Sequence, residues 1–346
     1  MAILKNLLSL CLPAIILTGC YSDFNPDDYS TPVLCINSTI TAGEPIEVSV
    51  SRTWRYNEPL DSAEQEVKDA RISIYINGEL QECGYVAKEG DEIRIVAEST
   101  EYGKAESSVK VPYTVPIDEV EFIPYGVRIL EWNKEAYSDQ EEYSVYVGFD
   151  FEVRLRITDR YQGREWFRLG GDTYALGYPD EDQDVDDDIE CPHRSYAILR
   201  LGELDYNSDM IFKEHIGIAE SVMGGYETLG MFFTDRAFSG SDYEICLRFD
   251  GASFEASSEE FEAALLDCGV TFRLMAISES YYNRLNYLWQ KNSGIIGDLA
   301  DIGLSDPIWG YSNVSTGAGV VVAKSVTTYD LDFHDFLKQA LEDDYK

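Results

Sequence analysis

Apolar and polar residues alternate with a period of two over much of the chain, which is the pattern of half-buried β-strands. The alternation is regular in residues 46–50 and 72–76, where every second position is isoleucine or valine. The second segment ends at Asn77-Gly78, a dipeptide that accepts the positive φ angles of a tight hairpin. About six short strands fit into residues 32–112. This spacing predicts an antiparallel sandwich of the immunoglobulin-like or transthyretin-like kind.

A longer alternation marks a second region, residues 113–346. Every odd position from Val147 to Ile157 is apolar, and the even positions between them are polar or small. Residues 166–169 follow a Gln162-Gly163 turn and are expected to pair with that long strand. Further strands are predicted at 119–122, 197–201, 230–233, 243–249 and 270–274. The fold class is therefore all-β: an N-terminal sandwich, then a larger β-domain with a few helical inserts.

Helical inserts are predicted where apolar residues recur with a period of 3.6 behind a capping residue. Ser257-Ser258-Glu259-Glu260 forms a capping box before one such stripe, and a second helix is expected to begin near Ser278. A third stripe follows Asp332, the candidate cap, at the C-terminus. We expect this last helix to pack on its own domain, with binding of a partner as the alternative.

The charge balance narrows the range of partners. The 346 residues include 27 basic and 64 acidic side chains, a formal net charge of −37. Because nucleic-acid binding depends on cationic side chains that neutralise phosphates, nucleic acid is excluded as an expected partner. The 24 tyrosines and 26 glycines agree with a β-rich chain that has many turns.

Residues 1–19 have the features of a secretory signal peptide. Lys5 precedes an apolar run, residues 7–17, that is too short to span a bilayer. The run ends in Leu17-Thr18-Gly19-Cys20, which resembles the bacterial lipobox, in which the cysteine thiol receives diacylglycerol. We therefore expect a lipoprotein with acyl chains such as palmitate at Cys20; the alternative is an ordinary secretory peptide with an incidental cysteine.

Residues 20–31 are acidic, contain proline and lack hydrophobic periodicity, so they are predicted to form a solvated tether. Ser22 and Asp23 resemble the short Ser/Asp-rich signals that send Bacteroidota lipoproteins to the outside of the outer membrane. The localisation expected from this resemblance is the cell surface. The alternative is a flexible linker that faces the periplasm.

Metal sites have little support in the sequence. Apart from Cys11 and Cys20, five cysteines remain, an odd number without any CxxC unit, so neither a disulfide framework nor a Cys/His zinc site is predicted.

An acidic run near residue 180 offers weak candidates for Ca²⁺, because alternate aspartates supply oxygen ligands. Val185 and Cys191, however, occupy positions where an EF-hand needs Gly and Glu, so a solvated loop is favoured and no cofactor is expected. The candidate Ca²⁺ ligands are Asp180, Asp182, Asp184 and Asp186.

No catalytic motif is present: the sequence has no GxSxG elbow, HExxH helix or Walker loop. Gly317-Ala318-Gly319 precedes an apolar run without a helix start, so it is interpreted as a bend that enters a buried strand, not as a phosphate cradle. Trp54 and Trp309 are the candidate ligand-binding tryptophans, because an aromatic ring can stack on a sugar or a peptide. No catalytic residues are predicted, and the ligand is left open.

Several short motifs resemble, in their order, the Bacteroidota lipoproteins catalogued as domain of unknown function 4249. The likeness extends from about residue 33 to residue 323. It rests mainly on Leu34-Cys35-Ile36-Asn37, Asp69-Ala70-Arg71-Ile72, Phe233-Thr234-Asp235, Ile277-Ser278-Glu279-Ser280 and Tyr311-Ser312-Asn313-Val314. Members are typically encoded near TonB-dependent receptors, and no catalytic residues are defined for them.

The resemblance implies a non-enzymatic accessory role beside a TonB-dependent receptor in nutrient uptake. The expected partners are the outer membrane, through the lipid anchor, and such a receptor. A structural or adhesion protein of the cell surface is the alternative.

Overall fold

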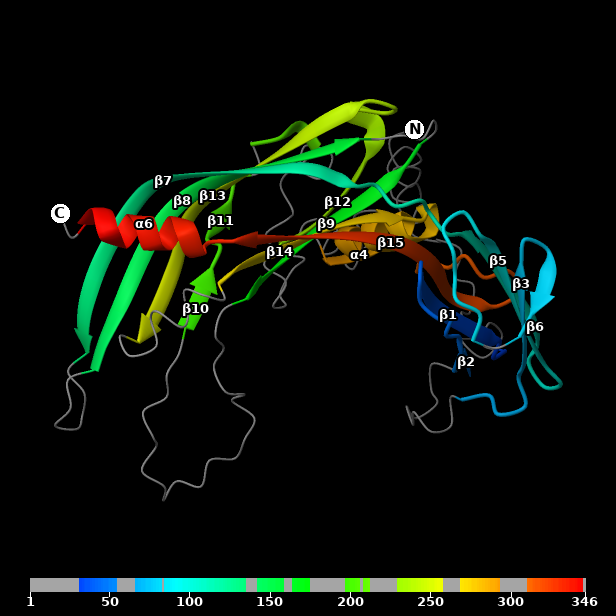
Figure 1. Ribbon diagram of the computed structural model, residues 1–346. Coiled ribbons are helices and arrows are strands. Elements are labelled where there is room, and N and C mark those ends of the chain that lie inside the picture. The colour runs from blue at the N-terminus through cyan, green and yellow to red at the C-terminus, as the bar shows by residue number, and fades with distance from the viewer. Residues whose placement is uncertain are drawn as a thin grey trace, which may run out of the picture.

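The computed structural model describes residues 31–54, 66–82, 84–134, 142–158, 164–174, 197–205, 208–211, 229–257, 268–292 and 310–344. These residues form three β-sheets and two α-helices, with one short 3-10 turn at Asp235–Ala237. The predicted all-β class is therefore confirmed. Figure 1 shows the sheets arranged along an elongated molecule, with the first strands near one end and the C-terminus near the other.

The four-stranded sheet has the order β4-β3-β5-β6. Its hairpin turns at Asn77 and Gly78, whose φ angles of 52° and 88° are those that the dipeptide predicts. Inward-facing side chains such as Ile74 and Ile95 are buried against β1. The strands are β3 (Arg71–Ile76), β4 (Glu79–Gln81), β5 (Glu92–Ser99) and β6 (Gly103–Lys110).

The six-stranded sheet joins both ends of the chain, in the order β12-β9-β14-β15-β1-β2. Strand β1 pairs antiparallel with β2 and parallel with β15, so the N-terminal strands and the C-terminal region share one sheet across residue 112. The predicted bend at Gly317-Ala318-Gly319 leads directly into β15. The strands are β1 (Leu34–Thr41), β2 (Ser49–Arg52), β9 (Trp166–Tyr174), β12 (Leu229–Thr234), β14 (Gly269–Ile277) and β15 (Ala318–Asp332).

The third sheet contains the longest strands and arches over one end of the molecule (Figure 1). Its order is β10-β13-β8-β7, and β11 also pairs with β13. The odd positions of β8 from Val147 to Ile157 are buried, as the alternation predicts. The strands are β7 (Ile117–Lys134), β8 (Glu142–Thr158), β10 (Ala197–Arg200), β11 (Glu203–Leu204) and β13 (Asp242–Ser257).

One predicted pairing is wrong. The pattern places residues 166–169 beside the long strand that precedes them, but β9 lies between β12 and β14 in the other sheet, and the neighbours of β8 are β7 and β13. Proximity along the chain favours a hairpin, but Phe167 of β9 packs on Phe233 of β12, with ring centroids 5.5 Å apart, and this contact joins strands that are distant in the sequence. Alternation specifies which face of a strand is buried and not which strand lies beside it.

Two helices complete the described structure. Helix α4 (Glu279–Asn292) begins directly after Ser278, as predicted, and α6 (His334–Asp344) begins after Asp332, whose Oδ1 accepts a hydrogen bond of 2.7 Å from the His334 amide. The helix predicted after Ser257 lies outside the described residues. Among the described helices, none has the length and hydrophobicity needed to cross a membrane.

Candidate binding site

The face of the arched sheet that points away from the core carries a lattice of opposite charges. Its centre is the even-numbered side of β8, which alternates with the buried side of that strand. Arg156 lies between Glu119 of β7 and Glu244 of β13, and Glu152 lies beside Arg248 of β13. Cross-strand neighbours of opposite charge stabilise a sheet face, and here three strands contribute to one network.

Glu152 is the best buried member of this network. Arg154 Nε donates to its Oε1 at 2.7 Å, and Arg248 donates through a terminal guanidinium nitrogen to Oε2 at 3.0 Å. The Glu152 side chain is 10% exposed, whereas the two arginine side chains are 40% and 46% exposed. Each carboxylate oxygen therefore accepts from one arginine, and the network continues outward because a terminal nitrogen of Arg154 also contacts Glu121 at 3.3 Å.

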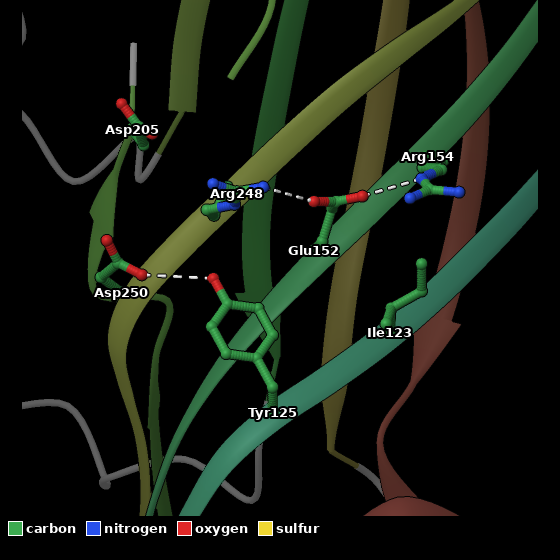
Figure 2. Close-up of a pocket in the computed structure, with 7 residues that line it drawn as sticks. All are labelled: Ile123, Tyr125, Glu152, Arg154, Asp205, Arg248 and Asp250. Carbon is green, nitrogen blue, oxygen red and sulfur yellow. Dashed lines mark hydrogen bonds and ion pairs between the residues drawn. The ribbon is translucent and has the colours of Figure 1, made fainter. Parts of the chain in front are cut away.

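A cavity of about 470 Å³ opens beside this carboxylate. Figure 2 shows Arg248, Glu152 and Arg154 in a row across β13 and β8, with Tyr125 reaching from β7 toward Asp250. The distance from the Tyr125 hydroxyl, the donor, to the Asp250 carboxylate is 3.3 Å. The lining residues are Ile123, Tyr125, Glu152, Arg154, Asp205, Arg248 and Asp250.

The pKa shifts indicate which groups carry charge here. Burial of Glu152 alone would raise its pKa, but the hydrogen bonds from Arg248 and Arg154 outweigh burial and lower it. Burial and the negative charge of Asp250 raise the pKa of Tyr125. At neutral pH the site therefore holds an ionised carboxylate and a protonated phenol.

Cys246 lies on the same sheet face, between Arg248 and Glu244 along β13. Burial, together with the nearby charge of Glu152, raises the pKa of its thiol to about 11. Since the thiolate is the reactive form, this cysteine is a weak nucleophile at neutral pH. The chemistry that the site offers is recognition through ion pairs and hydrogen bonds.

A short segment holds the edge of β13 beside the cavity. Asp209, which is buried, accepts hydrogen bonds from the Tyr243 hydroxyl at 2.5 Å, the Cys246 amide at 2.8 Å and the Ile211 amide at 3.0 Å. These bonds fix residues 208–211 against the strand. The lining residue Asp205 is held between β13 and this segment, since its amide donates to the Arg248 carbonyl at 2.8 Å and its carbonyl accepts from the Ser208 amide at 2.9 Å.

Residues 22–330 match a family described as a domain of unknown function, DUF4249. This match covers most of the chain. The chain belongs to the DUF4249 family. This match confirms the family membership that the short sequence motifs predict. A search of curated protein sequences found no match.

Most of the predicted site residues of this DUF4249 chain lie outside the described structure. They are Leu17, Thr18, Gly19, Cys20, Ser22, Asp23, Asp180, Asp182, Asp184, Asp186 and Trp309. Trp54 is described: it follows β2 and is 46% exposed. Within the described ranges no cluster of three His, Cys, Asp or Glu side chains is arranged to hold a metal ion, and the described cysteines Cys35, Cys246 and Cys268 form no disulfide with one another.

The charged lattice is not among the sites predicted from the sequence, although part of its signal is present there. The even positions of β8 form a polar face in the alternation, and four consecutive ones, Asp150, Glu152, Arg154 and Arg156, are charged. What the sequence lacks is the register: nothing in the local pattern indicates that Glu152 lies opposite Arg248, 96 residues away. The site depends on that pairing.

Proposed function

We propose that this protein is a lipid-anchored lipoprotein of the outer membrane, exposed at the cell surface, and that it acts by binding a partner and not by catalysis. The observation that carries the proposal is the sequence Leu17-Thr18-Gly19-Cys20, which closes a short apolar run. Two or three acyl chains on Cys20 would make the anchor lasting, since each buried methylene contributes about 0.8 kcal/mol. The family match begins at residue 22, just after this cysteine.

The charged face of the arched sheet supports a binding role. Three carboxylates belong to one end of the lattice: Asp150 lies opposite Tyr125 in the strand pairing, Asp250 accepts from the Tyr125 hydroxyl, and Asp205 lines the same cavity. The Asp250 charge already acts on the Tyr125 hydroxyl. In a chain with a net charge of −37, such an end favours a partner surface that carries lysine or arginine side chains, because opposite charge speeds and orients the encounter.

A TonB-dependent receptor is the partner that we propose, with nutrient uptake as the process. This part rests on the genetic neighbourhood that the family resemblance implies. A structural or adhesion role at the surface is the second candidate, because an extended β-protein on a lipid tether suits both tasks. Loss of nutrient uptake in a strain that lacks the protein supports the receptor role, whereas full uptake with loss of cell adhesion supports the second.

Acylation is tested with radiolabelled palmitate and cell fractionation. The wild-type chain should carry the label and sediment with the outer membrane, and Cys20→Ser should lose both properties. Cys11→Ser is the matched control, because it removes a thiol from the same segment and should change neither. Surface exposure is measured by protease treatment of intact cells. An unlabelled wild-type chain would overturn the proposal.

The docking face is tested by copurification with TonB-dependent receptors after extraction in mild detergent. Asp250→Lys reverses one charge at the acidic end of the lattice and should reduce the recovered receptor. Glu98→Lys makes the same change at an exposed position of β5, in another sheet, and should leave recovery unchanged. Equal recovery with both variants would exclude this face as the contact.

A further inference from the structure

A second cavity, of about 480 Å³, lies where the end of β6, the start of β9 and the end of β14 meet the first turn of α4. Three aromatic side chains contribute to its wall, from three separate segments. They are Tyr113, Trp166 and Tyr311, with the cations Lys110 and Arg164 beside them. Large aromatic side chains around a cleft between structural units are typical of ligand sites.

One wall of this cavity is the open edge of β6. In the pairing of β6 with β5, Glu106 lies opposite Val96, yet the backbone of Glu106 exchanges both of its hydrogen bonds with Ser315 on the other side, at 2.8 and 3.2 Å. Because antiparallel strands alternate in the direction of their backbone groups, Ser108 and Lys110 must also face outward. Among the described residues, no backbone group pairs with the N–H or C=O of Ser108 or Lys110 on that side.

The chain itself shows how this edge accepts an extended segment. Residues 313–315 run antiparallel to β6: Ser315 bridges to Glu106, and the Ser107 hydroxyl donates to the Asn313 carbonyl at 2.9 Å. Further along, Ser108 and Lys110 line the cavity on one side while Tyr311 and Asn313 line it on the other. The strand pairing thus stops where the cavity begins.

The polar side chains around the cavity are largely engaged within the protein. Asn313 donates to the Val321 carbonyl at 2.7 Å and accepts from the Val321 amide at 2.9 Å. The Ser280 hydroxyl donates to the same carbonyl at 2.9 Å, and the Ser278 hydroxyl accepts from the Ala323 amide at 3.0 Å. A sugar would need such side chains for its hydroxyl groups. Beside them the cavity offers the charged side chains of Lys110, Arg164 and Glu279 and the backbone groups of a strand edge, a combination that suits the polar main chain of a peptide.

We propose that this cleft binds a short peptide in extended conformation, which adds to the edge of β6 at Ser108 and Lys110 and packs its side chains against Tyr113, Trp166 and Tyr311. Recognition of this kind takes its affinity from main-chain hydrogen bonds and its selectivity from pockets for alternate side chains. The inference rests on the proposed function only in taking the chain to be a binding protein. It requires neither the lipid anchor nor a receptor, so either proposal can fail alone.

The first test is affinity selection. The full chain, purified in mild detergent, is offered a mixture of random hexapeptides with acetylated and amidated ends, and retained peptides are identified by mass spectrometry. Ser108→Pro removes the outward N–H without removing a bond to β5, a change that edge strands tolerate. The affinity of this variant for the selected peptides should be lower by about tenfold or more, as expected for one lost hydrogen bond. Ser108→Ala keeps the N–H and should bind like the wild type.

The second test leaves the protein unchanged. Each amide of the best hexapeptide is methylated in turn, and the Kd is measured by calorimetry with the wild-type chain. Strand addition predicts weak binding for every second methylated position and normal binding for the positions between them, because alternate N–H groups face the edge. Retention of no peptide in the first test, equally tight binding of the selected peptides by the Ser108→Pro chain, or equal tolerance of methylation at all positions would overturn the proposal.

Discussion

Gly319 of β15 lies beside Ile36 of β1 so closely that a Cβ atom at position 319 would overlap the Ile36 carbonyl oxygen. The φ angle of Gly319 is +109°, a conformation that residues with a side chain rarely adopt. This approach of two backbones starts the parallel pairing that runs from Cys35 with Ala318 to Thr41 with Lys324. One glycine therefore controls the junction through which the C-terminal region completes the sheet begun by the first strands.

Gly319→Ala is expected to destabilise the protein strongly. Backbone strain at such a φ angle costs about 1–3 kcal/mol, and the overlap with Ile36 adds to this cost. Gly43→Ala is the matched control, because Gly43 also has a positive φ of 86° but has no neighbouring atom within 4 Å of the place that a Cβ atom would take. Urea unfolding should show a larger loss for Gly319→Ala than for Gly43→Ala. Equal losses would mean that conformation alone, and not the contact with β1, requires the glycine.

Glu152→Gln should lower the free energy of unfolding by about 1–2 kcal/mol at neutral pH, because two charge-assisted hydrogen bonds are weakened. This loss is smaller than is usual for a fully buried ion pair, since both arginine partners regain water easily. Glu121→Gln is the control: its side chain is 56% exposed and its only described ion pair is with Arg154 at 3.3 Å. Urea unfolding should show a change of no more than about 0.5 kcal/mol there.

The effect of Glu152→Gln on the free energy of unfolding should also depend on pH. The pKa of Glu152 is lower in the folded chain than its ordinary value of 4.5, so its contribution to stability is present above that value and is lost as the pH falls through the folded pKa. The difference in unfolding free energy between wild type and Glu152→Gln should stay constant from neutral pH down to about pH 5 and shrink below it. A difference that grows in acid would contradict the ionised state of Glu152.

Cys246 should react slowly with iodoacetamide in the folded protein. Because its pKa is about 11, against an ordinary value of 9.0, the thiolate fraction at pH 8 is reduced roughly 100-fold. Alkylation followed peptide by peptide with mass spectrometry gives the rate, and the same cysteine in the urea-unfolded chain is the reference. Glu152→Gln should speed the reaction by removing the adjacent negative charge. Equal rates in the folded and unfolded chains would contradict this environment.

The local sequence pattern is sufficient to predict those structural elements that depend on residues only a few positions apart. The hairpin at Asn77-Gly78, the buried odd positions of β8 and the starts of α4 and α6 are all confirmed, because turn chemistry, side-chain alternation and capping act between near neighbours. The pattern also predicts the bend at Gly317-Ala318-Gly319, but it does not indicate which strand lies beside this bend. The bend needs glycine because the backbone of β1, from the other end of the sequence, lies directly against it.

Pairing between distant strands is not predictable in this way. The assignment of β9 to the wrong sheet and the unrecognised ladder around Glu152 share one cause: a single sequence specifies which face of a strand is polar but not which strand lies beside it. The cleft at the end of β6 is the extreme case, since residues from four separate stretches meet there. None of them stands out until the register is known.

Leu337 tests the role of the C-terminal helix, for which binding of a partner is the alternative to packing on its own domain. In the structure Leu337 is fully buried, and the neighbouring Phe333 stacks on Phe122 of β7 with ring centroids 5.0 Å apart. Leu337→Ala should therefore cost about 2–5 kcal/mol in urea unfolding, as expected for a large core truncation. Lys338→Ala, one position further on an exposed face, should cost almost nothing. If both variants were equally stable, the helix would contribute little to the core, and its apolar side would again be available to a partner.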